Sequence, residues 1–257
     1  MYKFLFLLLL TPVLAFAEPN TVVYNLTKQQ VMSGSLESNE VSIASISKLM
    51  TAYTVLSENQ DLSEKLPVTG KKTPNTFVHK GMILTRHDLL NLALVSSDNL
   101  AAQTLAENFP GGYSRFIQKM NDHARELGMN NSGFVEPTGL SPMNYSTVGD
   151  IVLLVKEVSK FEFVKNAAQS NNVAFTQPIK QKKKTTEKKI IRNPTIKYFG
   201  KEGVITIKTG FTKAAGFCIT MLVQSNNVLY NITVLGAKTK QERQKLIEEA
   251  LRIIYTA

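Results

Sequence analysis

A serine and a lysine three residues apart stand at the start of an apolar stretch of the chain. Ser45 and Lys48 open a run to Leu56 in which apolar residues recur at helical spacing, which predicts a helix over 45–56. Residues i and i+3 share one helix face, and the first turn favours developing negative charge. A lysine in an apolar, positively charged site can be neutral and take the proton of a serine nucleophile. The pair could therefore form an acyl-enzyme, although about one or two such Ser-x-x-Lys matches arise by chance at this length.

Two further short patterns follow along the chain. Ser97-Asp98-Asn99 separates two apolar helical stretches, 89–95 and 100–107, and is predicted to be a loop that presents polar side chains. Lys208-Thr209-Gly210 ends a predicted strand, and its glycine permits the close approach of another segment. The three patterns together are the signature of penicillin-binding proteins and class A β-lactamases.

With these motifs the chain resembles the low-molecular-mass penicillin-binding proteins, which are serine D-alanyl-D-alanine peptidases. Within them it is most similar to the D-alanyl-D-alanine endopeptidase branch (penicillin-binding protein seven). The passages that carry this similarity are 44–52, 92–99, 110–113, 127–131, 134–140 and 208–212. The resemblance implies hydrolysis of peptidoglycan stem peptides through an acyl-enzyme, with β-lactam antibiotics as covalent inhibitors. Both an endopeptidase that cuts D-alanyl cross-links and a carboxypeptidase that removes terminal D-alanine remain open, with the endopeptidase favoured.

The resemblance also implies a role for each motif residue. Catalysis falls to Ser45, Lys48 and Ser97, substrate binding to Asn99, Lys208, Thr209 and Gly210, and the oxyanion hole to the backbone N–H groups of Ser45 and Phe211. No cofactor and no metal are expected, and the three histidines, His79, His87 and His123, lack the spacing of metal ligands.

Glu136 is the residue that could distinguish a peptidase from a β-lactamase. Class A β-lactamases use a glutamate to activate the water that releases the acyl group, and a β-lactamase is therefore one alternative function. Here the glutamate lies in the loop phrase 136–140, typical of D,D-peptidases, so we expect it to be structural. A slow cell-wall binding or sensor protein is another alternative, which the intact motifs argue against.

The N-terminal residues have the pattern of a secretory signal peptide. Lys3 precedes an apolar run over 4–10, and Ala15-Phe16-Ala17 fits a cleavage site after Ala17. We therefore expect an exported, periplasmic protein without a stable membrane anchor, because no later stretch is long and apolar enough to span a bilayer. Cys218 is the one cysteine, so no internal disulfide can form, and its apolar strand favours a buried structural thiol.

The charge of the chain is strongly positive. Thirty Lys and Arg against twenty Asp and Glu give a net charge of +10, which favours anionic polymers of the cell envelope. The densest cluster comprises Lys180, Lys182, Lys183, Lys184, Lys188 and Lys189. No aromatic residues alternate with these lysines, so nucleic acid is not an expected partner, and a solvated loop or β-ribbon is the simpler interpretation.

The order of predicted elements indicates an α+β fold. Strands are predicted at 21–26, 30–35, 204–209, 217–223 and 228–235, and helices at 45–56, 89–95, 100–107, 113–127, 147–158 and 241–255. We expect one antiparallel sheet flanked by helices, with an inserted all-helical lobe, as in the β-lactamase and D,D-peptidase fold. The predicted single domain is 18–257, with its sheet from 18–40 and about 200–257, its helical lobe over about 45–160 and a lysine-rich segment over about 175–200.

Overall fold

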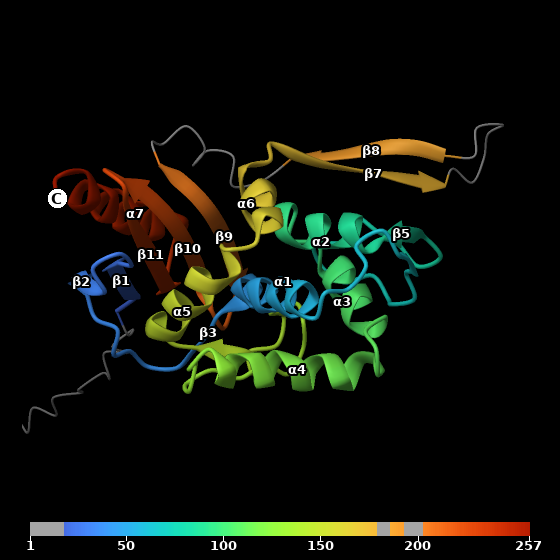
Figure 1. Cartoon of the computed structure of the whole chain (residues 1–257), viewed down its shortest axis with the longest axis horizontal. Coiled ribbons are helices and arrows are strands. Elements are labelled where there is room, and N and C mark those ends of the chain that lie inside the picture. Colours follow the sequence, from blue (N-terminus) through green and yellow to red (C-terminus); the bar gives the residue numbers. More distant parts are fainter. Residues whose placement is uncertain (1–17, 179–185, 193–202) are drawn as a thin grey trace, which may run out of the picture.

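A computed structural model describes residues 18–178, 186–192 and 203–257. Its main sheet is antiparallel, with strand order β2-β1-β11-β10-β9 (Figure 1). The strands are β1 (Asn20–Asn25), β2 (Gln30–Gly34), β9 (Val204–Thr212), β10 (Gly216–Ser225) and β11 (Val228–Ala237). Asn20 of β1 lies opposite Leu235 of β11, so strands from distant parts of the sequence build one sheet.

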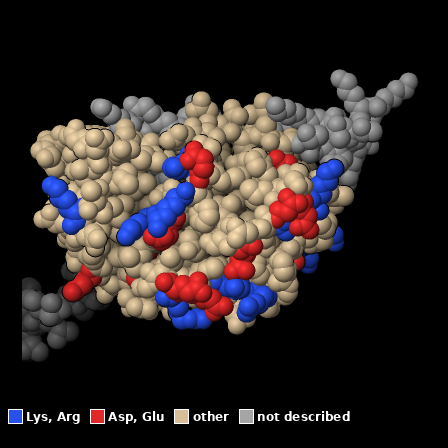
Figure 2. Space-filling view, in the orientation of Figure 1, with Lys and Arg blue, Asp and Glu red and all other residues tan. Residues whose placement is uncertain are grey.

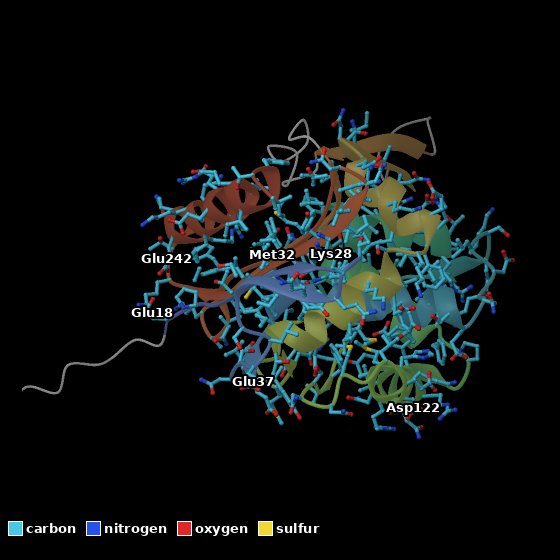
Figure 3. All side chains as sticks on the ribbon, turned by 60° about the vertical axis from the view of Figure 1, so that its left-hand side comes forward. Glu18, Lys28, Met32, Glu37, Asp122 and Glu242 are labelled. Atoms are coloured by element: carbon cyan, nitrogen blue, oxygen red, sulfur yellow. The ribbon has the colours of Figure 1, made fainter. Side chains whose placement is uncertain are left out.

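Helix α7 (Lys240–Tyr255) covers one face of this sheet, as the sequence predicts. Alternate residues of β10 point to opposite faces: Met221 packs with Ile247 of α7, whereas Cys218 joins the core shared with the other helices. Thr239 caps α7 by accepting a hydrogen bond from the backbone N–H of Glu242. Figure 3 brings this side of the molecule forward, with Glu242 on α7 and Met32 on the β1–β2 hairpin.

The other helices lie beside the sheet and surround α1 (Ser47–Ser57), which is largely buried. They are α2 (Arg86–Val95), α3 (Asn99–Glu107), α4 (Gly112–Glu126), α5 (Val148–Val158) and α6 (Glu162–Gln169). Two short strand pairs complete this part: β3 (Val41–Ser42) with β6 (Tyr145–Ser146), and β4 (Lys65–Pro67) with β5 (Ile83–Thr85). The predicted α+β class is confirmed, while α6, β3, β5 and β6 were not predicted.

One predicted boundary is wrong in a way that matters for the site. The α-helix begins at Ser47 rather than at Ser45, and a 3₁₀ turn, Ala44–Ile46, precedes it. The apolar periodicity continues through that turn, so it did not reveal the change of geometry.

The lysine-rich region contains a two-stranded ribbon. β7 (Asn172–Pro178) and β8 (Thr186–Arg192) run from α6 past α2 (Figure 1), anchored by the buried pair Val173 and Ile191. Lys188 and Lys189 lie in β8, whereas Lys180, Lys182, Lys183 and Lys184 are outside the described residues. On the face shown in Figure 2, basic and acidic side chains are interspersed.

The predicted signal peptide, 1–17, also lies outside the described residues and stays a prediction. Among the helices that the structure describes, none has the length and apolar character needed to cross a membrane.

Candidate active site

Ser45 lies on the 3₁₀ turn that leads into α1, at a point where three segments meet. Ala44 before it has a left-handed backbone, φ 47°, which is strained for a residue with a side chain. A Cβ on Gly139 would stand 1.8 Å from the carbonyl oxygen of Ala44, and one on Gly210 would stand 2.8 Å from the backbone nitrogen of Ser45. Both glycines are therefore required so that their backbones can approach the turn.

Lys48 lies one turn further along and is fully buried. Its Nζ donates hydrogen bonds to Ser45 Oγ at 2.9 Å, to Asn99 Oδ1 at 2.6 Å and to the Thr138 carbonyl oxygen at 2.7 Å. Burial lowers the pKa of Lys48 well below its usual value, and the positive charge of Lys208 lowers it further. A lysine so placed loses its proton readily and lies within hydrogen-bond distance of the serine oxygen.

The loop between α2 and α3 supplies the second motif. Ser97 has a left-handed backbone, φ 58°, and Asp98 caps α3 by accepting a hydrogen bond from Ala101 N at 2.8 Å. Asp98 also accepts from Phe77 N at 2.5 Å, which ties the loop to the preceding 70–80 segment. Burial raises the pKa of Asp98. Asn99 is thereby held with its Oδ1 on Lys48.

Strand β9 supplies the third motif on the opposite side. Lys208 is buried, and its Nζ donates to Ser97 Oγ at 3.0 Å and to the Thr209 carbonyl oxygen at 3.0 Å. Burial lowers its pKa to about 7. The cluster of catalytic side chains thus contains two lysine–serine pairs, Lys48 with Ser45 and Lys208 with Ser97, and the second pair joins the sheet to the helical lobe.

A cleft of about 540 Å³ opens over this cluster. It is lined by Ser45, Pro74, Asn75, Ser96, Ser97, Asn99, Gly139, Leu140, Thr209, Gly210, Phe211, Thr212, Phe217, Lys240 and Arg243. Every residue that the sequence assigned to the site lines this cleft or bonds directly to a residue that does. A second cavity, of about 660 Å³ between the β1–β2 hairpin and α5, is larger but shares no residue with the cleft.

The contacts of Glu136 support the structural role predicted for it. Its carboxylate accepts hydrogen bonds from Thr138 N at 2.7 Å, Thr138 Oγ1 at 2.5 Å and Gly139 N at 2.6 Å. These bonds shape the loop that presents the Thr138 carbonyl to Lys48. Both carboxylate oxygens are therefore engaged within the loop itself.

Three parts of the site were not predicted from the sequence. Asn75 donates from Nδ2 to the carbonyl oxygens of Ser96 and Ser97, at 3.0 and 2.7 Å, and so supports the second motif. Gly139 makes room for the nucleophile turn. Arg243 of α7 lines the cleft, is 7% exposed, and donates from Nη1 to the Cys218 carbonyl oxygen, while its Nε has no hydrogen-bond partner among the residues that the structure describes. Gly139 lies in the loop phrase 136–140, which could have indicated it, whereas no short motif marks Asn75 or Arg243, because their roles come from tertiary contacts.

Other groups with possible chemistry stand apart from the cleft. Cys218 is buried, and burial raises the pKa of its thiol to about 11, so it remains a protonated structural thiol as predicted. Among the described residues, no three His, Cys, Asp or Glu side chains converge as a set of metal ligands.

Comparison with known proteins shows the family to which the chain belongs. A model of the D-alanyl-D-alanine carboxypeptidase family matches residues 15–239. The chain belongs to the D-alanyl-D-alanine carboxypeptidase family. The resemblance predicted from the three motifs is therefore confirmed.

The chain is also similar to individual members of known function or structure. A D-alanyl-D-alanine endopeptidase of Escherichia coli is 39% identical over 208 residues, which cover 76% of this chain and 63% of the relative. The match therefore spans less than two thirds of the relative's length. A Streptomyces DD-transpeptidase has the same fold, with a TM-score of 0.81 at 22% identity over 91% of this chain and 95% of that chain. A penicillin-binding protein from Listeria monocytogenes, solved with ampicillin bound, has a TM-score of 0.76 at 25% identity over 91% of this chain and 96% of that chain.

Proposed function

We propose that the protein is a serine D-alanyl-D-alanine peptidase that hydrolyses peptidoglycan stem peptides through an acyl-enzyme at Ser45. The observation that carries the proposal is the buried Lys48 Nζ at 2.9 Å from Ser45 Oγ, in a cleft. A base at this distance can take the proton of the hydroxyl as it attacks a carbonyl carbon. The same family membership supports β-lactams as covalent inhibitors, because their strained amide presents an equivalent carbonyl.

The acylation step uses both lysine–serine pairs and Asn99. Lys48 accepts the proton of Ser45 as the new C–O bond forms. Ser97, within hydrogen-bond distance of Lys208, relays this proton from Lys48 to the leaving nitrogen as the C–N bond breaks, so Lys48 returns to its neutral form. Asn99 holds Lys48 and donates to the peptide group of the substrate.

The edge of the sheet stabilises charge on the substrate. The backbone N–H groups of Ser45 and Phe211 form the oxyanion hole, and Gly210 permits this arrangement because its missing side chain leaves room beside Ser45 N. Thr209 binds the carboxylate of the leaving residue. Lys208, whose Nζ donates to the Thr209 carbonyl oxygen, and Arg243, which lines the cleft, supply positive charge.

Water then releases the acyl group. The hydrogen bonds that the Glu136 carboxylate accepts favour a peptidase over a β-lactamase. Its carboxylate already accepts hydrogen bonds from donors of its own loop, among them Thr138 N and Gly139 N. It therefore lacks the free oxygen that would activate a deacylating water as in class A β-lactamases. We expect a long-lived penicilloyl adduct rather than rapid turnover.

The similarity to an endopeptidase of Escherichia coli supports cleavage of D-alanyl cross-links, with removal of terminal D-alanine as the alternative. The amino-terminal pattern ending at Ala17 supports export to the periplasm, where these substrates are found.

The test uses the purified protein with two defined muropeptides, a pentapeptide monomer and a cross-linked dimer, followed by mass spectrometry. We expect the dimer to be split, and we expect Ser45→Ala to lose both this cleavage and covalent labelling by penicillin. Thr54→Ala serves as the matched control, because this buried hydroxyl of the same helix donates to the Met50 carbonyl oxygen and has no bond to a site residue in the described part of the chain. Labelling or cleavage retained in Ser45→Ala would refute the proposal, and loss of alanine from the monomer alone would make the protein a carboxypeptidase.

A further inference from the structure

Two aromatic rings extend the cleft beyond the nucleophile. Phe211, the residue after the Lys-Thr-Gly motif, is 54% exposed, which is unusual for a phenylalanine in a sheet. It lies directly opposite Phe217 of β10, and the rings stack with centroids 4.2 Å apart and planes at 26°. Both residues line the same cleft as Ser45. They present an apolar surface at the end of the site.

Two cations from the start of α7 close this end of the cleft. The guanidinium of Arg243 lies 6.0 Å from the centroid of the Phe217 ring and is held by its bond to the Cys218 carbonyl oxygen. Lys240, one turn earlier, is exposed and lines the cleft. No Asp or Glu is among the described residues that line the cleft. The region beyond Thr209 therefore combines an aromatic wall with positive charge.

The charge distribution assigns this region to the leaving side of the substrate. The leaving residue carries a carboxylate, and the cationic side chains of the cleft, Lys240 and Arg243, both come from α7. The opposite wall consists of Pro74, Asn75 and the 96–99 loop, whose lining side chains are uncharged. Phe211 lies two residues from Thr209 and opposite Phe217, so a carboxylate bound at Thr209 would place the leaving residue close to the two rings.

We infer that Phe211, Phe217 and Lys240 form a leaving-strand subsite that takes the aliphatic arm of a cross-linking diamino acid and the carboxylates attached to it. This inference rests on the proposed peptidase function and deepens it by naming the residues that favour the cross-linked substrate. A terminal D-alanine carries only a methyl group and leaves the rings uncovered. The leaving strand of a cross-link carries a hydrocarbon chain, which buries apolar surface against the ring pair, and further anionic groups within reach of Lys240.

The test measures discrimination rather than absolute rate. For the wild type, Phe211→Ser and Phe217→Leu, kcat/KM is measured for the cross-linked dimer and for the pentapeptide monomer. We expect the dimer-to-monomer ratio to fall about tenfold in Phe211→Ser and severalfold in Phe217→Leu, mainly through a higher KM for the dimer. Ile83→Ser is the matched control, because it removes a 64% exposed apolar side chain from β5 outside the cleft, and its ratio should equal that of the wild type.

A second measurement determines how tightly the released product binds, independently of the catalytic step. The released monomer, which carries the free amine of the diamino acid, should inhibit the wild type as a product, and its inhibition constant should rise about tenfold in Phe211→Ser. A dimer-to-monomer ratio and an inhibition constant within twofold of wild type in both Phe variants would overturn the subsite. A wild type that does not cleave the dimer would instead overturn the proposed endopeptidase function itself, so the two failures are distinguishable.

Discussion

Two buried lysines at the centre of the site must be in opposite protonation states to work as proposed. Lys48 accepts a proton from Ser45 and must be neutral, which its pKa, lowered by burial and by Lys208, permits. Lys208 supplies positive charge and must be protonated, yet burial lowers its pKa to about 7. Acylation should therefore decline at low pH as Lys48 gains a proton, and decline again above about pH 7 as Lys208 loses its own.

Lys208→Arg separates the acidic decline of the acylation rate from the alkaline one, because a guanidinium stays protonated throughout this pH range. We expect the alkaline decline to disappear while the acid limb remains, although the rate at pH 7 should fall because the planar group fits the buried position poorly. The measurement is the pH dependence of Ser45 acylation by a fluorescent penicillin. Lys213→Arg, an exposed lysine in the β9–β10 turn, should retain the wild-type profile. An unchanged alkaline limb in Lys208→Arg would show that another group titrates there.

At the level of elements, the loop 136–140 and the 3₁₀ turn depend on each other. Gly139 has φ 80°, and an added Cβ would meet backbone atoms of Ala44 rather than a movable side chain. Gly139→Ala must therefore displace the loop, and with it the Thr138 carbonyl that accepts from Lys48. We expect penicillin acylation to slow by more than about tenfold and the protein to lose roughly 1–3 kcal/mol of stability, the range for strained backbone positions.

Gly81→Ala is the matched control for that prediction. Gly81 has φ 91°, but no atom of the described residues lies within 4 Å of the position that a Cβ would occupy. The substitution therefore introduces a comparable backbone strain without the collision, and it should lower the melting temperature while leaving the acylation rate at the wild-type value. Equal acylation rates in the two variants would show that the Gly139 contact does not position the site.

These contacts also show what the sequence could and could not predict. The motif residues came together as expected, because each short pattern belongs to an element whose type periodicity or turn chemistry predicts. The left-handed Ala44 and the support from Asn75 were not predictable, because both depend on segments that are adjacent only in the folded chain. Arg243 lies in a helix whose amphipathic pattern predicted only that it covers the sheet.

At the scale of the whole molecule, the cleft lies where the helices meet the edge strand β9, so both parts must be docked for the site to exist. Lys48 and Asn99 come from the helical part, and Lys208 comes from the sheet. The hydrogen bond between Lys208 and Ser97 crosses this boundary directly. Substrate bound in the cleft would contact both parts, and we infer that it stabilises their docking as well as the site.

The net charge of the molecule acts over a longer range than any of these contacts. Replacing the six lysines of the 180–189 cluster by glutamine would lower it from +10 to +4. The sacculus is a large polyanionic surface, so we expect its binding at low salt to weaken severalfold and to lose much of its salt dependence. Cleavage of a small soluble dimer should change little, because its reaction depends on the cleft. Cosedimentation with sacculi at two salt concentrations, alongside soluble-dimer kinetics, checks both expectations. Unchanged sacculus binding would show that the cluster takes no part in approach to the wall.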